Sequence, residues 1–260
     1  MGFRVRFGIM DEAGYTVSLK GGLRMTMLIV AALVFIGIHL LISGTRLRDA
    51  IVAVIGARPY LALFALASIA AIVWLCISYN RAQAGDADPV LYDLGRGVHD
   101  LAIPVVLIAF LIAVPGLLAP SPTSVRGQMT GAMPDTARGV IAITRHPFLM
   151  GVAIWSAFHL AANGDEASVI FFGSFFVLAA VGPASIDAKR RRKMGAQWES
   201  FAAHTSIVPF AAAISGRAHL NWREILDWRM AVALLLFLIL LFAHPHLFGV
   251  SPFPGGGTPV

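Results

Sequence analysis

The stretch ITRHPFLMGVAIWSAFHLAANGD, residues 143–165, decides how this chain is interpreted. It places an Arg-His-Pro step, beginning at Arg145, at the start of an apolar helix and a second histidine, His159, deep inside that helix. An ionisable imidazole in hydrocarbon costs free energy unless it is paired, ligated or hydrated, so a histidine at membrane depth indicates a functional site. This interpretation requires the whole chain to have the composition of a membrane protein.

The composition meets that requirement. Hydrophobic residues make up 58% of the chain and charged residues 13%, with a mean hydropathy of +0.77, whereas a soluble domain carries roughly 25% charged residues. The sequence predicts an all-α polytopic integral membrane helical bundle, because a helix needs about 17 to 25 apolar residues to cross the hydrocarbon core. Six stretches qualify: 27–45, 59–79, 98–119, 147–163, 166–183 and 229–248. A tight turn, Asn163-Gly164-Asp165, joins the fourth to the fifth.

The net charge of +6 does not indicate nucleic acid binding, because the cations alternate between loops. Lys and Arg number three in 46–58, two in 80–97, three in 120–146, none in 164–165 and eight in 184–229, so alternate loops hold fourteen against two. The positive-inside rule places the fourteen in the cytoplasm and both ends of the bundle outside.

One transmembrane domain is expected over residues 25–250. Residues 1–24 are expected to be a disordered or mis-assigned N-terminal extension, and 251–260 a flexible tail. The segment from 184 carries a Lys/Arg run followed by Met194, Trp198 and Phe201 at helical intervals, a pattern typical of an interfacial amphipathic helix on the cytoplasmic side. With Cys76 as its single cysteine, the chain has neither a disulfide framework nor a cysteine zinc site.

The depths of three histidines limit which of them can share a metal. Pro147 suits the first position of the fourth helix, which puts His146 at the cytoplasmic face and His159 about 18 Å above it. Those two are thirteen residues apart, roughly 20 Å along a helix, so they cannot bind one metal together. His39 lies within about 10 Å in depth of either, and both pairings stay open. Two imidazoles from facing helices with apolar walls suit a haem, while the alternative is simple hydrogen bonding between helices.

Three blocks of sequence resemble the NnrU family, which is similar to plant zeta-carotene isomerase. They are HLLISGTRLRDAIVAVIGARPYLALFALAS (39–68), the segment 143–165 and TSIVPF (205–210). The resemblance implies a haem b held by two histidines that correspond to His39 and His159. Ser156 stands where the isomerase has a cysteine implicated as an alternative ligand, and a hydroxyl is a poor substitute for a thiolate on iron. This difference argues against ligand switching, and against an isomerisation that depends on it.

A more distant resemblance is to the isoprenylcysteine carboxyl methyltransferases, which use S-adenosylmethionine. Residues 145–151 (RHPFLMG), Asp187 and residues 195–201 (GAQWESF) match that group in part. However, Leu149 replaces a tyrosine and the group's paired acids are reduced to one. The match therefore favours shared architecture over methyl transfer.

Together these observations predict an NnrU-family protein that crosses the bacterial inner membrane several times. His39 and His159 are expected to ligate haem b, with Arg145 and His146 at the cytoplasmic mouth, where Arg145 pairs with a haem propionate or with lipid phosphate. The resemblance implies either isomerisation of a hydrophobic small molecule or a role in nitric oxide metabolism and denitrification. The alternatives are a non-enzymatic component of denitrification and, less favoured, a methyltransferase, so the sequence does not decide whether the protein is an enzyme. The expected surroundings are the lipid bilayer; no protein partner is predicted.

Overall fold

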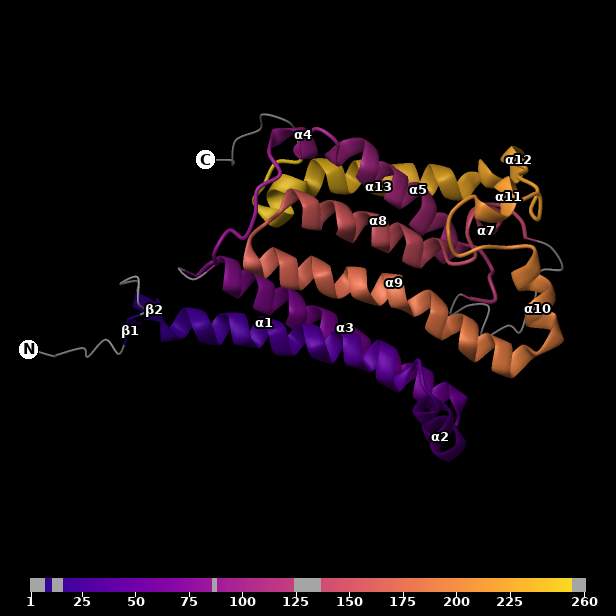
Figure 1. Ribbon diagram of the computed structural model, residues 1–260, viewed down its shortest axis with the longest axis horizontal. Helices are drawn as coiled ribbons and strands as arrows, with labels where there is room; N and C mark the ends of the chain where they lie inside the picture. Colours follow the sequence, from indigo (N-terminus) through magenta and orange to yellow (C-terminus); the bar gives the residue numbers. More distant parts are fainter. Residues whose placement is uncertain (1–7, 11–15, 86–87, 124–136, 254–260) are drawn as a thin grey trace, which may run out of the picture. The chain divides into compact units, whose positions relative to one another are not determined.

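The computed structural model describes residues 8–10, 16–85, 88–123 and 137–253 (Figure 1). These residues form two compact units, which are treated separately below: one contains Met1–Asp93 and Asn163–Phe175, the other Leu94–Ala162 and Phe176–Val260. Much of the predicted N-terminal extension and of the predicted tail lies outside the described residues.

The predicted membrane-spanning character is confirmed. Within the described residues, five helical segments are long and apolar enough to cross a bilayer: Gly21–Ile42, Ala57–Gln83, Arg96–Leu118, Glu166–Met194 and Trp228–Phe248. The fourth predicted span forms the shorter helix α8, Pro147–Ala162, of 16 residues. At 1.5 Å per residue it is about 24 Å long. The chain is therefore a polytopic helical membrane protein.

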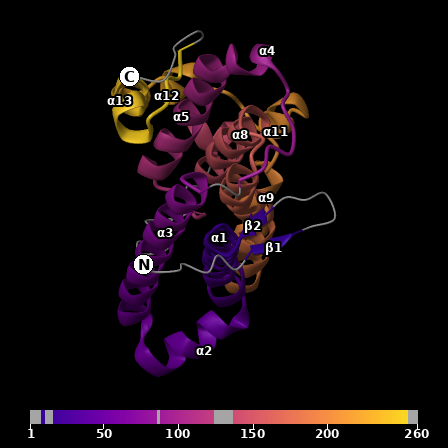
Figure 2. The ribbon, with the colours of Figure 1, turned by 90° about the vertical axis from the view of Figure 1, so that its left-hand side faces the viewer.

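The first unit is built on two long helices. Figures 1 and 2 show α1 (Leu19–Gly37) beside α3 (Ala57–Gln83), with Leu28 and Leu75 fully buried. The other elements are the antiparallel pair β1 (Gly8–Met10) and β2 (Thr16–Ser18), the π-helical turn η1 (Ile38–Ile42), α2 (Arg46–Ile55) and the start of α9 (Glu166–Met194).

The second unit contains most of the remaining helices. In it α5 (Ala102–Leu118) packs on α8 and on α13 (Trp228–Phe248). Shorter elements are α4 (Arg96–His99), α7 (Val140–Ile143), α10 (Ala196–Ala203), α11 (Ala211–Ile214) and α12 (Trp222–Ile225). The later part of α9 also belongs to this unit.

Two glycines allow α5 and α8 to approach each other closely. A Cβ on Gly151 would lie 2.5 Å from the carbonyl oxygen of Ala109 and 2.5 Å from the Cβ of Ala113. A Cβ on Gly116 would lie 2.6 Å from the Cγ of Pro147. Small residues at helix crossings are the usual way to pack helices in lipid, where apolar side chains gain nothing by leaving their surroundings.

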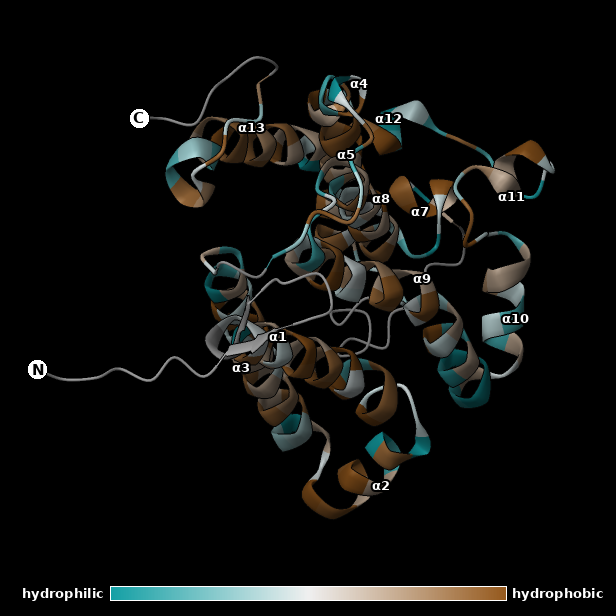
Figure 3. Ribbon diagram, turned by 60° about the vertical axis from the view of Figure 1, so that its left-hand side comes forward, coloured by the Kyte–Doolittle hydropathy of each residue, from teal (hydrophilic) through white to brown (hydrophobic). Residues whose placement is uncertain are grey.

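Large apolar side chains remain exposed along the long helices. Leu33 is 64% exposed, Leu66 is 64% and Phe242 is 64%, and Figure 3 shows hydrophobic residues along α1, α3, α5 and α13. In water such surfaces would drive association. In a bilayer they contact lipid, and the helices satisfy their own backbone groups.

The segment after residue 183 differs from the expected surface helix. Helix α9 continues through Pro183 and the basic run to Met194, so the helix extends beyond the end predicted for the fifth span. Trp198 and Phe201, expected at the lipid interface, lie on α10 with 0% and 5% exposure. They pack in a protein core whose other buried members are Val140, Ile141, Ile143 and Ile225. An apolar helix face does not by itself distinguish lipid from protein as its partner.

Replacing Gly151 with alanine is expected to destabilise the protein by about 1–3 kcal/mol, because the added methyl overlaps a neighbouring backbone oxygen. The matched control is Gly173→Ala in α9, where a Cβ meets nothing within 4 Å; that change should be neutral or slightly stabilising. Thermal unfolding in detergent measures both. Equal midpoints for the two variants would contradict close packing of α5 against α8.

Candidate functional site

The Arg-His-Pro step is held in place by a distant segment of the same unit. The amide of Arg145 donates to the carbonyl of Ser206 at 2.9 Å, and the amide of Phe210 donates to the carbonyl of Ile143 at 2.8 Å. The hydroxyl of Thr144 donates to the carbonyl of Ile207 at 2.7 Å and accepts the amide of His146 at 3.3 Å. Two of the three sequence blocks, 143–165 and 205–210, therefore meet directly.

Asp187 of α9 binds both residues of that step. Its Oδ2 accepts from Arg145 Nε at 2.9 Å and lies 2.7 Å from Arg145 Nη2, while its Oδ1 lies 2.7 Å from His146 Nε2. Arg145 also donates through Nη1 to the carbonyl of Thr205 at 3.2 Å. His146 is 3% exposed and Asp187 7%. A buried carboxylate needs such partners, since unpaired it would lose its hydration without compensation.

This arrangement gives Arg145 and His146 a structural task. The carboxylate acts as an acceptor, so His146 carries its proton on Nε2 when it is neutral. The hydroxyl of Thr123 also holds this step, since it donates to the carbonyl of Arg145 at 2.7 Å. A role for either residue toward a cofactor stays a prediction. Asp187, which the methyltransferase resemblance singled out, is here the anchor of the whole step.

His159 lies in the last turn of α8. Its Nδ1 is 2.8 Å from the carbonyl oxygen of Trp155, one turn earlier. The ring is partly buried and contacts two aromatic side chains, with centroid distances of 4.9 Å to Trp155 and 5.7 Å to Phe158. The surroundings are apolar, as predicted.

His39 lies in the π-helical turn that ends the first span. Its Nδ1 is 2.8 Å from the carbonyl oxygen of Phe35, and its ring centroid lies 4.8 Å from Phe35 and 5.4 Å from Phe64. The turn is closed by the amide of Ser43, which donates to the carbonyl of Ile38 at 3.1 Å. Such one-turn π insertions occur frequently at functional sites, and nothing in the sequence pattern indicated this one.

Both intramembrane histidines share one feature of ligating imidazoles. A carbonyl oxygen only accepts, so Nδ1 carries the proton and Nε2 is the electron-pair donor, the form in which histidine binds a metal. The bond alone is not diagnostic, because exposed His204 makes the same contact with the carbonyl of Ser200 at 2.9 Å. The aromatic and apolar surroundings distinguish His39 and His159 from it. His39 belongs to the first unit and His159 to the second.

A haem site with two axial histidines uses fewer protein ligands than the clusters of three or more that bind other metals. Among the residues that the structure describes, no three His, Cys, Asp or Glu side chains gather as a metal site. Haem requires only one or two axial donors from the protein.

A polar cluster at the start of α9 was not predicted. Asp88 Oδ1 accepts the amide of Ala167 at 2.9 Å, and Asp165 Oδ1 accepts the amide of Ser168 at 2.8 Å. The hydroxyl of Ser168 lies 2.9 Å from that of Tyr79. Burial, together with the charges of Asp165 and Glu166, raises the pKa of Asp88 above its ordinary value. The carboxylates complement the positive end of the helix dipole, so the cluster has a capping role.

Comparison with known proteins connects these blocks to one family. The family described as "NnrU protein" matches residues 27–252. The chain is 25% identical to the chloroplastic 15-cis-zeta-carotene isomerase of Zea mays over 228 residues, covering 84% of this chain and 60% of the relative. It is 25% identical to the Arabidopsis thaliana protein of the same name over 243 residues, covering 90% of this chain and 63% of the relative. It thus spans about three fifths of their length. No solved structure matches.

Replacing Asp187 with asparagine is expected to cost about 3–5 kcal/mol, because one buried partner of an ion pair is removed and the charge of Arg145 is left behind. The control is Asp49→Asn: the side chain of Asp49 is 58% exposed and pairs with Arg48 at 3.1 Å, and loss of a pair with a solvent-exposed carboxylate costs less than about 1 kcal/mol. Thermal unfolding in detergent compares the two. Similar losses would show that the buried triad does not anchor this unit.

Proposed function

The chain belongs to the NnrU family, and on that premise we propose that it is a haem b protein of the bacterial inner membrane that isomerises a hydrophobic polyene. The observation that carries the haem proposal is the matched environment of His39 and His159. Each sits in an apolar helix, each has Nδ1 bonded to its own helix, and each packs against aromatic rings. Nε2 is then the donor that each ring offers to iron.

When bound, haem b supplies a one-electron redox centre within the hydrocarbon layer. His39 and His159 would hold it through Nε2. The carbonyls of Phe35 and Trp155 fix the tautomer of the two imidazoles, and the neighbouring aromatic rings exclude water. Isomerisation about a carbon–carbon double bond makes no net change of atoms, and the proposed route relies on the redox centre rather than on a general acid or nucleophile of the chain. This fits a membrane interior with few ionisable side chains.

Substrate class is inferred from the relatives, both named as 15-cis-zeta-carotene isomerases. A polyene of that kind is soluble in the bilayer and can reach an intramembrane site without crossing water. This chain differs from the isomerases at one position that the resemblance implicates in haem ligation, where Ser156 replaces a cysteine. Ser156 is fully buried, and its hydroxyl donates to the carbonyls of Val152 at 2.7 Å and Ala153 at 3.2 Å. We propose that any isomerisation here proceeds without a second protein ligand at this position.

The haem proposal is tested by the optical spectrum of the detergent-purified protein expressed with adequate haem supply. We expect a sharp Soret band and, on reduction, α and β bands. Both His39→Ala and His159→Ala should lose most of this absorbance. His204→Ala is the matched control, since its ring makes the same helical bond but is exposed. A colourless wild-type protein, or full absorbance in both variants, would reject the proposal.

The isomerase proposal is tested by expression in a bacterial strain that accumulates 15-cis zeta-carotene. Pigment extracted from cells with the wild-type protein should contain the 15-trans form, and cells with His159→Ala should not, as shown by chromatography with absorbance detection. A haem-loaded protein that leaves the pigment unchanged would contradict isomerisation while leaving the haem proposal intact.

A second candidate function is a role in nitric oxide metabolism or in assembly of the denitrification apparatus, which does not depend on the cysteine that Ser156 replaces. Without the thiolate, the polyene chemistry of the relatives loses one of its implied components. For this candidate, nitric oxide titrated onto the reduced protein should shift the Soret band. The methyltransferase alternative is weakened because Arg145, His146 and Asp187 bind one another; calorimetry with S-adenosylmethionine should give no heat.

A further inference from the structure

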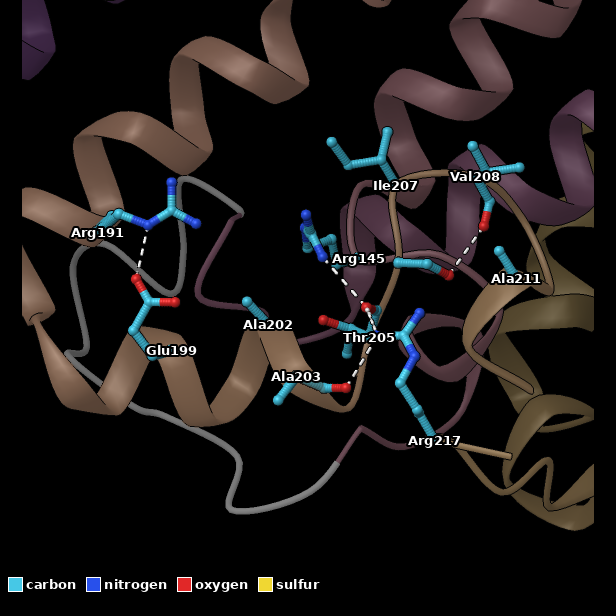
Figure 4. Close-up of a pocket in the computed structure, with 11 residues that line it drawn as sticks. Arg145, Arg191, Glu199, Ala202, Ala203, Thr205, Ile207, Val208, Ala211 and Arg217 are labelled. Carbon is cyan, nitrogen blue, oxygen red and sulfur yellow. Dashed lines mark hydrogen bonds and ion pairs between the residues drawn. The ribbon is translucent and has the colours of Figure 1, made fainter. Parts of the chain in front are cut away.

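A pocket beside Arg145, separate from the two intramembrane histidines, is lined by three arginines. It has a volume of about 530 Å³ and is formed within the second unit by the ends of α9 and α10, the 205–208 segment and the start of α11. Figure 4 shows Arg145 and Arg217 on either side of Thr205, with Arg191 and Glu199 paired at the edge. One carboxylate thus accompanies three guanidinium groups in the lining.

Two of these positive groups are held next to each other by one neutral acceptor. The carbonyl oxygen of Thr205 accepts from Arg145 Nη1 at 3.2 Å and from Arg217 Nη1 at 3.3 Å. Like charges brought together in this way repel each other, and an anion placed between them would be attracted by both. These hydrogen bonds hold the two guanidinium groups close together and so maintain a region of positive potential.

Arg217 is the cation whose charge is least balanced. Its other hydrogen bonds reach the hydroxyl of Ser215 at 2.9 Å and the carbonyl of Ala203 at 2.9 Å, both neutral groups. Within the described part of the chain no carboxylate lies within 4 Å of it, whereas Arg145 has Asp187 and Arg191 has Glu199. Arginine presents a planar fork of donors that matches phosphate oxygens.

One side of the lining is apolar. Ile207, Val208 and Ala211 line the pocket, and Val208 is 64% exposed. A free inorganic anion would make no use of these apolar side chains. An amphiphile would place its chain there while its headgroup meets the arginines.

We propose that this pocket binds the phosphate group of an anionic membrane phospholipid. The surrounding charges agree with a lipid source. Five consecutive basic residues, 189–193, end α9 next to the pocket, and cation-rich segments face the leaflet that carries anionic lipid. Arg217 and Arg145 flank the phosphate, Arg191 adds positive charge at the edge of the pocket, and the lipid chain lies over Val208. The site would tie the cytoplasmic end of the bundle to the membrane surface.

The experiment measures stabilisation of the detergent-purified protein by three probes: short-chain phosphatidylglycerol, phosphatidylcholine of the same chain length, and sodium phosphate. Thermal midpoints are recorded against probe concentration at constant ionic strength. We expect half-maximal stabilisation at a lower concentration of phosphatidylglycerol than of phosphatidylcholine. Sodium phosphate should act only weakly; stabilisation by sodium phosphate as strong as by the lipid would overturn the lipid source.

Arg217→Gln removes the charge and keeps a donor, so it should raise the half-maximal phosphatidylglycerol concentration at least fivefold, while Arg217→Lys should recover part of the loss. Arg223→Gln is the matched control, since Arg223 is exposed in the same unit but outside the pocket lining. Equal response of the wild type and Arg217→Gln, or an equal loss in Arg223→Gln, would overturn the site. The Soret band serves as an independent readout and should be unchanged in Arg217→Gln.

Discussion

The carboxylate of Asp187 is the interaction on which the second unit depends. It receives a guanidinium and an imidazole from consecutive residues, so it fixes the direction in which the chain enters α8. The same step pairs through its backbone with Ser206, and Arg145 reaches the carbonyl of Thr205. One buried charge thus orders three segments that are far apart in the sequence. Such a cluster is weak as a source of stability, because desolvation consumes most of the Coulombic gain, but it is strong as a source of specificity when its loss leaves unpaired charges.

The bilayer imposes the second constraint, because its hydrocarbon offers no hydrogen bonds to the backbone and little reward for burying apolar side chains. The helices satisfy their backbone groups with intrahelical hydrogen bonds. Because burial of apolar side chains contributes little, the helices also pack closely, as at Gly151 against Ala109, where backbone atoms come nearer than a methyl group would allow. Polar side chains interact in two clusters, around Asp187 within α9 and around Asp88 at its start. Within lipid, the histidines bond their own helices.

Sequence alone could predict the membrane class, the helical bundle and the apolar environment of His39 and His159, because hydropathy depends on local composition. It could not find the partner of the Arg-His-Pro step, since Asp187 lies 42 residues beyond Arg145 and spacing gives no reason to join them. It misjudged Trp198 because an apolar helical face fits lipid and protein equally well. It ended the fifth span at residue 183 because charges end a hydropathy window, whereas a helix can continue into water. The π turn at His39 carries no compositional signal.

The short length of α8 explains why the turn after it forms backbone hydrogen bonds with residues 89–92. A helix of 16 residues is about 24 Å long, less than the ~30 Å of hydrocarbon, so the turn after it needs partners for its backbone groups. Residues 89–92 provide them. The amide of Leu91 donates to the carbonyl of Gly164 at 2.7 Å, and the amide of Glu166 donates to the carbonyl of Pro89 at 3.0 Å. Contact is so close that a Cβ on Gly164 would overlap the carbonyl oxygen of Tyr92. The polar segment between the second and third spans therefore lets α8 end early, which leaves His159 only three residues from the end of that helix.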